Sequence, residues 1–359
     1  MWSHQIISTP EEFERLEPIW SQVWSHSHLL GKPFWHFDWI RAWVRHFAAN
    51  QLFIVVVFEH EEPIAILPLV RKPMGSFRLA PLRVLAFMGQ GYITVYNDVM
   101  VSDIARQPML AVDYLMRLLR RQCLRGYVAQ LHNVPEDSTL WRYLRAHPSR
   151  WSLDGQPGEM CLELPLDGEV YVRGEIARKL RRVARQGPLH LVEVQEQESI
   201  QQFLDGLVAT HRLTWSHAAS DRFLDPRYTG VLRDGLPPLV AQGVVNLTWL
   251  RQGSATLGWH VEFRDERRAY GFAHAYNPAF RSMSPGKLMV CQLLLRAQPL
   301  VDVYDFLHGE DAYKFDWKPR ARRNWEFQLH SPAYGAVRQV LQSVRAWRNH
   351  GRHHRIKAL

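Results

Sequence analysis

The sequence predicts an α+β fold made of two similar halves, each with a mixed, mostly antiparallel β-sheet flanked by helices. Three observations lead to this prediction. The chain has 359 residues, which is enough for two domains of ordinary size. Its hydrophobic fraction of 47% is sufficient to build a large core. The same order of elements, a hairpin before a helix and a strand, occurs once in each half, although no repeat is visible at the level of residues.

The first half is predicted to span residues 1–155 and to begin with helices. Apolar residues recur at spacings of three and four over Glu11–Ser25 and again over Phe34–Phe47, which is a helical period. Tryptophans four residues apart in the second of these helices could form a stacking platform for a sugar or a base. The same spacing is typical of a face that packs in the core, and we favour core packing.

The rest of the first half is predicted to alternate strands and helices. Two apolar runs, Leu52–Phe58 and Pro63–Val70, flank a charged turn and indicate a β-hairpin. A strand-like region follows at Val84–Val101 and is interrupted by Gly89 and Gly91. No helix follows these glycines directly, so a bulge is favoured over a phosphate loop. The remaining elements are a helix at Ala105–Leu124, a strand at Tyr127–His132 and a helix at Asp137–Ala146.

A boundary is predicted at Pro148–Gly158, which is rich in turn-forming residues, so the second half is placed at residues 156–331. Its first strand, Cys161–Leu166, is expected to cross from the first half to the second. The following elements are helices at Gly174–Gly187, Ile200–Ser216 and Tyr228–Gln242, and strands at Leu189–Val194, Val244–Arg251, Ser254–Phe263 and Arg267–Tyr276.

The helix predicted at Gly174–Gly187 is strongly basic. Five cations lie within eight residues, at Arg178, Lys179, Arg181, Arg182 and Arg185. Two interpretations are open. The helix could bind RNA, or it could be a solvated helix that lays its arginines along a cleft, where they would help to hold an anionic substrate or the phosphates of a cofactor. We favour the second because apolar residues form a stripe for burial on the same helix.

The net charge of +9 comes from the C-terminal end of the chain. Ten lysines or arginines and one acid lie between Lys318 and Lys357, and the rest of the chain is neutral. A protein that binds nucleic acid over its whole surface would spread this charge, so we interpret the basic segment as an appendage. Within residues 332–359, a helix at Pro332–Asn349 is expected to dock on the body, with a partner or an anionic membrane as the alternative contact.

Several classes of protein are not expected. The N-terminus has acids and a proline where a signal peptide needs a basic and then an apolar run, and no window reaches the ~18 apolar residues of a membrane span. We therefore expect a soluble protein of the cytoplasm. Cys123, Cys161 and Cys291 lie far apart and are expected to be buried thiols. Without a metal-binding motif or a nucleophile elbow, no metal is expected.

The most informative stretch is Tyr270–Trp317, which combines a strand, a turn, a helix, a second strand and a polar cluster. The strands are expected at Tyr270–Tyr276 and Val301–Leu307. Between them the turn at Arg281–Lys287 leads into the helix Leu288–Ala297. Its Ser-Pro-Gly-Lys run places a capping residue first, a proline at the first helical position, and then backbone N–H groups that favour an anion.

This order of elements resembles the cofactor half of the GNAT superfamily of acyl-CoA-dependent N-acyltransferases. The pyrophosphate loop of that family reads Arg/Gln-x-x-Gly-x-Gly/Ala, and this chain has Arg281-x-x-Ser284-x-Gly286, with serine in place of the first glycine. The ending Gly-x-x-x-Tyr-Lys-x-x-Trp also resembles the CelD-like proteins associated with exopolysaccharide and cellulose synthesis. These are related to the FemABX aminoacyltransferases and contain two GNAT-like halves. The resemblance covers most of the chain and is strongest in residues 226–317.

The resemblance implies an acyltransferase of bacterial type. Its donor would be acetyl-CoA or another acyl-CoA, and its acceptor an amine or hydroxyl of a polysaccharide or cell-envelope precursor. Two alternatives stay open: a FemABX-like transferase that takes its acyl group from aminoacyl-tRNA, the one nucleic acid expected as a partner, and a non-catalytic assembly or regulatory protein of envelope synthesis. The first half is expected to be degenerate, because its counterpart of the phosphate loop, around Asp103–Pro108, lacks a glycine.

The resemblance also implies roles for individual residues. Loop amides would hold the pyrophosphate, two cations would add charge, and two residues of the preceding strand would face the site. The residues expected to bind the cofactor are Arg281, Ser284, Pro285, Gly286, Lys287, His274 and Tyr276.

The catalytic groups are expected in the polar cluster that follows the second strand. Tyr313 is the proposed proton donor to the departing thiolate. The base is expected to be Glu310, or else His308 or Asp305, and Lys314 and Trp317 are placed on the substrate side. Two alternatives remain open: Glu310 could pair with Lys314 as a structural ion pair, and Trp317 could belong to the core.

Overall fold

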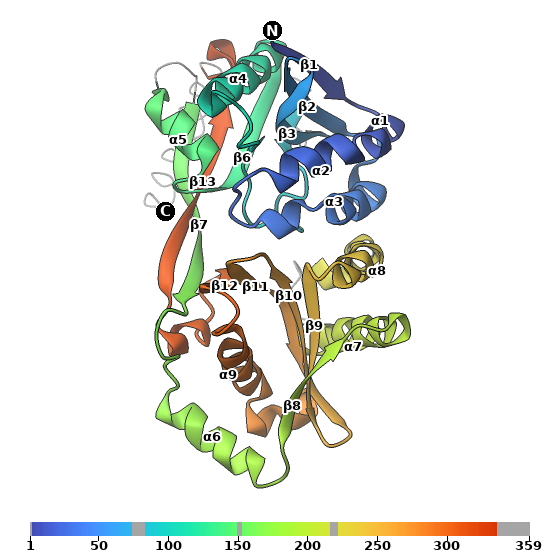
Figure 1. Cartoon of the computed structure of the whole chain (residues 1–359), viewed down its shortest axis with the longest axis vertical. Coiled ribbons are helices and arrows are strands. Elements are labelled where there is room, and N and C mark those ends of the chain that lie inside the picture. The colour runs from blue at the N-terminus through green and yellow to red at the C-terminus, as the bar shows by residue number, and fades with distance from the viewer. Residues whose placement is uncertain (1, 74–82, 149–152, 216–221, 336–359) are drawn as a thin grey trace, which may run out of the picture.

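The computed structural model describes residues 2–73, 83–148, 153–215 and 222–335. Through these residues runs a 13-stranded sheet with the order β1-β2-β3-β4-β6-β13-β7-β12-β11-β10-β9-β8, and β5 pairs with β3 outside this path. Figure 1 shows two bodies, one above the other, joined by the long strands β7 and β13. The predicted α+β fold of two similar halves is confirmed.

The upper body in Figure 1 contains the elements of the first half. They are β1 (Trp2–Ile7), α1 (Pro10–Arg15), α2 (Glu17–Ser25), the 3₁₀ helix η1 (Lys32–Trp35), α3 (Phe37–Trp43), the π-helical turn η2 (Val44–Ala48), β2 (Leu52–Glu59), β3 (Glu62–Pro73), β4 (Arg83–Phe87), β5 (Met100–Val101), α4 (Pro108–Leu124), β6 (Tyr127–Pro135) and α5 (Thr139–Ala146).

The remaining elements follow in the second half. They are β7 (Leu153–Pro165), α6 (Gly174–Ala184), β8 (Leu189–Val194), α7 (Gln197–Trp215), η4 (Arg222–Leu224), α8 (Pro226–Ala241), β9 (Val245–Gln252), β10 (Ala255–Arg264), β11 (Arg268–Tyr276), η5 (Pro278–Met283), α9 (Pro285–Ala297), β12 (Val303–His308), η6 (Lys314–Trp317) and β13 (Arg320–Leu329).

The two halves have the same strand topology. β1, β2, β3, β4 and β6 are neighbours in that order in the first half, as are β8, β9, β10, β11 and β12 in the second. In each series the neighbours are antiparallel except for the last pair, β4 with β6 and β11 with β12, which is parallel. A helix connects the two strands of each parallel pair, α4 in the first half and α9 in the second, as a parallel connection requires.

The halves exchange their last strands. β7 follows α5 of the first half but pairs with β12, so the predicted crossing strand is confirmed. β13 follows η6 of the second half but pairs with β6 of the first. The two exchanged strands also pair with each other, from Arg320 opposite Glu163 to Leu329 opposite Leu153. Each half therefore needs a strand from the other half to complete its sheet.

Three elements differ from the sequence prediction. The loop expected up to Gly158 is already part of β7, which begins at Leu153. In this first part β7 pairs with β13 but not with β12. The proline at 157 is tolerated because one edge of the strand is open there. The edge strand β1 was missed. β13 was missed as well, because Arg320 to Arg323 were interpreted as the start of a basic appendage, whereas they lie in the middle of the sheet. The predicted helix at 332–349 lies mostly outside the described residues.

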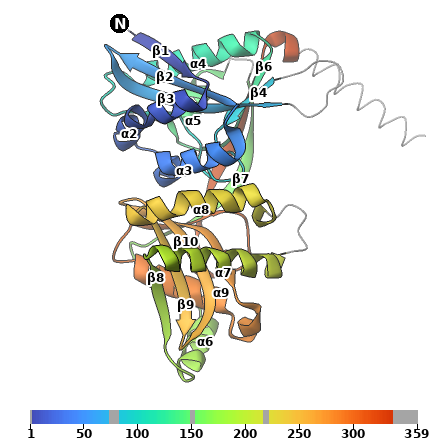
Figure 2. The same ribbon diagram turned by 90° about the vertical axis from the view of Figure 1, so that its right-hand side faces the viewer.

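The largest apolar cluster crosses the junction between the halves. Trp35, Trp39 and Trp43 of the tryptophan stripe are buried, so its predicted packing role is confirmed. The indole of Trp39 lies edge-on to Phe263 of the second half at 5.1 Å between ring centroids. Helices α3 and α8 pack against each other at this junction, as Figure 2 shows. The two halves therefore share one core and are expected to unfold together.

Other parts of the described chain agree with the sequence prediction. The three cysteines are free and buried, as predicted. No helix in residues 2–73, 83–148, 153–215 or 222–335 combines the length and the hydropathy needed to cross a bilayer.

Candidate active site

The site is built where β11 and β12 separate. These parallel strands pair only at their beginnings, from Arg268 opposite Val303 to Tyr270 opposite Asp305. Beyond this point β11 continues to Tyr276 without β12 as a neighbour. The backbone groups on this side of β11 are therefore not used in a ladder and can pair with a bound molecule. The two strands therefore splay apart after Tyr270 and Asp305.

A cavity of about 350 Å³, the loop cavity, opens between the end of β11 and the start of α9. It is lined by His274, Tyr276, Arg281, Ser284, Pro285, Gly286, Lys287, Asp311 and Tyr313. The structure therefore brings together all seven residues that the sequence predicted for cofactor binding, and it adds Asp311 and Tyr313 from the loop after β12.

The loop before α9 has an unusual conformation at Ser284. Its φ of 56° and ψ of 54° are left-handed, whereas a capping residue has extended backbone angles that let its side chain reach the first helical N–H groups. The predicted capping by the Ser284 hydroxyl is therefore wrong. The hydroxyl instead accepts a hydrogen bond from Lys179 Nζ at 2.9 Å. The start of α9 has no side-chain cap, and such a helix start can bind an anion through its N–H groups.

The cations beside the loop are only partly neutralised. Lys287 Nζ lies 2.6 Å from Asp316 Oδ2, and Arg173 also pairs with this carboxylate. Although burial acts in the opposite direction, the hydrogen bonds from Lys287 and Arg173 hold the pKa of Asp316 below its usual value. Asp316 is thus a fixed negative charge shared by two cations, which leaves the surroundings of the loop positive.

A second cavity of about 140 Å³, the strand cavity, lies at the carboxyl ends of β11 and β12. It is lined by Val95, Arg222, Gly271, Phe272, His274, Phe306, Leu307, His308, Asp311, Tyr313 and Lys314. The two cavities share His274, Asp311 and Tyr313. The rings of His274 and Tyr313 meet edge to face, with 5.4 Å between their centroids. These side chains therefore form the junction at which molecules in the two cavities could meet.

His274, His308 and Tyr313 are neutral near pH 7. Burial, together with the positive charge of Lys314, lowers the pKa of His274 to about 4. Burial and the charges of Arg222 and Lys314 lower the pKa of His308 to about 4 as well. Burial and the charge of Asp311 raise the pKa of the Tyr313 phenol well above its usual value. The site therefore holds two unprotonated imidazoles and one protonated phenol.

Lys314 is buried but fully engaged. Its Nζ donates to the carbonyl oxygens of His308 at 2.7 Å and Gly309 at 3.1 Å, and it lies 3.4 Å from Asp311 Oδ2. These contacts hold the loop after β12 against the end of that strand. Of the two alternatives for Glu310, the ion pair with Lys314 is not formed, because Asp311, one residue further, is the partner.

Two residues predicted for catalysis do not line either cavity. Glu310 is exposed on the surface. Asp305 is fully buried, where it accepts hydrogen bonds from Tyr96 Oη at 2.8 Å and from the backbone N–H of Leu307 at 2.8 Å. Trp317 is buried in the apolar cluster beneath α9, so of its two alternatives the core interpretation holds. Among the three candidates for a base, His308 is the one that lines a cavity.

The buried Asp305 leads to a prediction about stability and pH. Burial raises its pKa to about 6 in the folded protein, from an unfolded value of 3.8. Between these values the folded state binds a proton that the unfolded state has released, so the free energy of unfolding falls as the pH rises through this window and is constant above it. About two pKa units correspond to about 3 kcal/mol.

We expect Asp305→Asn to remove this component of the pH dependence. Urea unfolding followed by tryptophan fluorescence at several pH values between 4 and 7 measures it. Burial raises the pKa of Asp98 to about 6 too, so part of the slope remains in the variant. An unchanged slope would show that Asp305 is ionised throughout.

Sequence reasoning missed several residues of the strand cavity. Val95 and Arg222 come from segments far from residues 270–317 and reach the site only through the fold. The guanidinium of Arg222 lies over the rings of Tyr228 and Phe272, about 5 Å from each centroid. A local pattern could not reveal this contact. The sequence could have predicted the role of Asp311, because it lies three residues before Lys314, a spacing typical of ion pairs on a helical turn.

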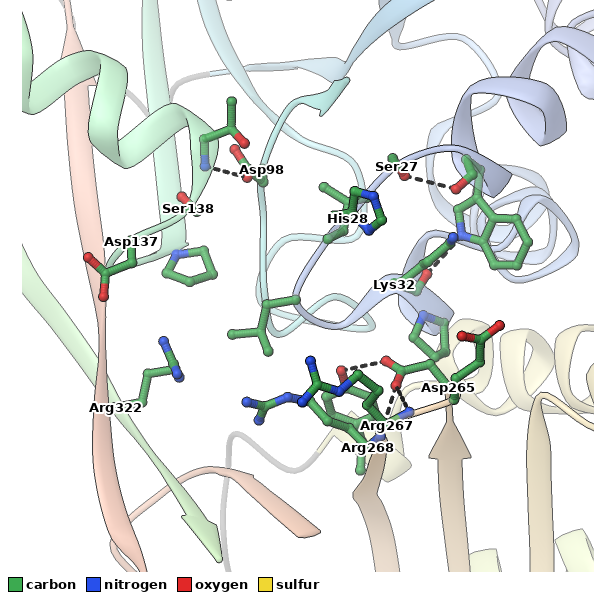
Figure 3. Close-up of a pocket in the computed structure, with 18 of the residues that line it drawn as sticks. Ser27, His28, Lys32, Asp98, Asp137, Ser138, Asp265, Arg267, Arg268 and Arg322 are labelled. Atoms are coloured by element: carbon green, nitrogen blue, oxygen red, sulfur yellow. Dashed lines mark hydrogen bonds between the residues drawn. The ribbon is translucent and has the colours of Figure 1, made fainter. Parts of the chain in front are cut away.

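A third cavity, of about 960 Å³, lies between the two halves. In Figure 3, Arg267 and Arg268 lie together near Asp265, and Arg322 lies apart from them, on the side of Asp137. Its arginines are paired: Arg267 with Asp302 at 2.7 Å, and Arg268 and Arg322 with one carboxylate, Glu163, at 2.8 and 3.3 Å. Because positive and negative groups balance each other there, its charge selects no class of ligand.

Comparison with known proteins shows which family model the second half of the chain matches. Residues 171–315 match the family model described as the acetyltransferase (GNAT) domain. The expected GNAT-like fold is thus confirmed. The match includes β11, the loop before α9 and most of the polar cluster, so it covers the lining of the loop cavity and that of the strand cavity except for Val95. No protein among the curated sequences matches the chain.

Several solved structures share the overall fold of nearly the whole chain. A structure of FemX is 12% identical and superimposes with a TM-score of 0.59, covering 93% of this chain and 99% of its own. L-PGS from Bacillus licheniformis is 9% identical with a TM-score of 0.56, covering 92% and 95%. The C-terminal domain of a putative lysylphosphatidylglycerol synthetase from Agrobacterium fabrum is 11% identical with a TM-score of 0.55, covering 92% and 97%. At these identities the similarity shows the fold alone.

Proposed function

We propose that this protein is an acyltransferase that moves an acyl group from acetyl-CoA or another acyl-CoA to an amine or hydroxyl. Transfer would be direct, with donor and acceptor bound at the same time. The observation that supports this proposal is the junction of the loop cavity and the strand cavity, which share His274, Asp311 and Tyr313. Two substrates held in adjoining cavities can react without a covalent enzyme intermediate.

The donor belongs in the loop cavity. Its pyrophosphate would lie at the uncapped start of α9, where Gly286 offers its backbone N–H group and the side chains of Arg281 and Lys287 add positive charge. The pantetheine arm would pair with the backbone of β11 where β12 has left it. The thioester would then lie near His274 and Tyr313, at the end of the cavity that adjoins the strand cavity.

The acceptor belongs in the strand cavity, where the groups for proton transfer are present. His308 would take the proton from the amine or hydroxyl as that group attacks the thioester carbon. The C–S bond of the tetrahedral intermediate then breaks, and Tyr313 gives its proton to the departing thiolate. An imidazole with a pKa of about 4 is a weak base but is unprotonated at neutral pH, and a phenol with a raised pKa remains a proton donor.

The acceptor class follows from the CelD-like ending of the sequence, Gly309-x-x-x-Tyr313-Lys314-x-x-Trp317. We propose a polysaccharide or another cell-envelope precursor as the acceptor. Lys314 and Arg222 bring positive charge to the strand cavity. This charge suits an acceptor that carries an anionic group close to its nucleophile.

Acyl-CoA binding is the direct test of the proposed function. We expect isothermal titration calorimetry with acetyl-CoA to give one site, with a dissociation constant between about 1 µM and 1 mM, as is usual for enzyme substrates. Lys287→Ala is expected to weaken binding several-fold, because it removes a charge from the pyrophosphate loop. Arg121→Gln, an equal loss of charge on the distant helix α4, serves as the control. A folded protein that binds aminoacyl-tRNA but neither acetyl-CoA nor longer acyl-CoAs would contradict the proposal.

Glu310 provides a test of the base assignment. Because its side chain is exposed and lines neither cavity, we expect Glu310→Gln to keep kcat/KM within about twofold of the wild type. Steady-state assays that detect free CoA measure this effect. A loss of a hundredfold or more would return Glu310 to the role of base and remove His308 from it.

A further inference from the structure

Helix α6 lies beside the loop that lines the loop cavity. It connects β7 to β8 and lies next to α9 (Figure 1). Its buried residues Ile176 and Val183 belong to the same apolar cluster as Leu288 and Leu294 of α9. The predicted buried stripe of this helix is therefore present, and it leaves the other face free for charged side chains.

Two cations of α6 contact the loop before α9. Lys179 Nζ donates to Ser284 Oγ at 2.9 Å, and Arg182 Nη2 donates to the carbonyl oxygen of Ser282 at 3.4 Å. The loop that lines the cavity is thus held from outside by this helix. Both contacts place positive charge beside the residues that would surround the pyrophosphate.

The charge on this face of the molecule is not balanced. Lys179 pairs with Glu175 at 3.1 Å, and Asp316 is shared by Lys287 and Arg173. Within the described ranges, three arginines of α6 and the arginine that caps its C-terminus have no carboxylate partner, and all four are exposed: Arg178, Arg181, Arg182 and Arg185. Unpaired arginines beside an anion-binding helix start favour a ligand with more than one phosphate.

We propose that α6 forms the outer wall of the donor site and that Arg178 and Arg182 bind the 3′-phosphate of CoA. The two residues are four apart and so project from the same side of the helix. Arg182 already contacts the loop, and the 3′-phosphate is carried by the ribose next to the pyrophosphate. The inference rests on the proposed function, since it assumes that acyl-CoA occupies the loop cavity. It adds a phosphate subsite supplied by the connection between the two halves.

The test compares CoA with 3′-dephospho-CoA, which differ only in this phosphate. By calorimetry we expect the wild type to bind CoA about tenfold more tightly than dephospho-CoA, which corresponds to about 1.4 kcal/mol. The variant Arg178→Gln/Arg182→Gln is expected to bind both ligands with the affinity that the wild type has for dephospho-CoA. Added salt should weaken CoA binding to the wild type and reduce the difference between the two ligands.

The control is Arg121→Gln/Arg125→Gln, an equal change of charge at exposed positions at the end of α4 in the first half. It is expected to keep the tenfold preference. Glutamine is a good helix former, so circular dichroism should show α6 intact in the test variant. A test variant that still prefers CoA over dephospho-CoA would overturn the inference. If that variant also loses affinity for RNA, the two arginines bind RNA instead of the 3′-phosphate. Failure of the wild type to bind CoA at all would instead contradict the proposed function.

Discussion

Replacing Tyr313 with phenylalanine is expected to lower kcat about 10²-fold or more while KM for the acyl-CoA changes little. Tyr313 lines both the loop cavity and the strand cavity, and burial with the nearby Asp311 keeps its phenol protonated. A group that donates a proton to the departing thiolate acts in the transition state, so its loss falls on kcat. Phenylalanine keeps the ring and its contact with His274 and removes only the hydroxyl.

The leaving group provides the control for this prediction. A donor whose thiol is more acidic than that of CoA needs less protonation as it departs. Tyr313→Phe should therefore lose much less activity with such a thioester, while the wild type gains little. Steady-state kinetics with both donors measures the two ratios. An equal loss with both would mean that the hydroxyl positions a substrate rather than donating a proton.

The fold could be predicted to the extent that its elements are local. Apolar periodicity and turn residues identified the meander β9–β11 and the helices α4 and α9. β13 was hidden because its charged side chains obscure the strand period. Its Arg322 is accommodated by Glu163 on the neighbouring β7, at 3.3 Å, a partner far away in sequence. Strand exchange between the halves is likewise a property of long-range pairing and leaves no local pattern.

The candidate site likewise contains residues that a local stretch of sequence predicts and residues that only the fold brings together. The residues of the loop cavity lie within Tyr270–Trp317, and a continuous stretch of sequence was enough to group them. The strand cavity needs Val95 from the first half and Arg222 from the segment before α8. The role of Ser284 was misassigned because the local sequence reveals neither its left-handed backbone angles nor the hydrogen bond that its hydroxyl accepts from Lys179 of another helix. Sequence position ranked Glu310 first as the base. Its exposure and the full burial of Asp305, which the sequence does not reveal, leave His308 as the candidate that lines one of the two cavities.

Replacing His308 with asparagine is expected to lower kcat by about 10²- to 10⁴-fold, the usual contribution of a general base. His308 lies at the end of β12, lines the strand cavity and has a pKa of about 4 because burial and the charges of Arg222 and Lys314 oppose its protonation. Its imidazole is therefore ready to accept a proton at any pH above that value. Asparagine retains a polar side chain of similar reach but cannot act as a base.

The pH profile distinguishes this role from a structural one. Protonation of His308 should lower the activity of the wild type only below about pH 4. This residue should therefore cause no fall in the pH–activity profile near pH 6.5, the usual pKa of histidine. Removing the positive charge of Arg222 by Arg222→Gln should move that acidic limb to higher pH, because one of the charges that oppose protonation is gone. If the acidic limb stays in place in Arg222→Gln and His308→Asn keeps full activity, His308 is excluded as the base. His274, a neutral imidazole that lines both cavities, would then take the proton from the acceptor.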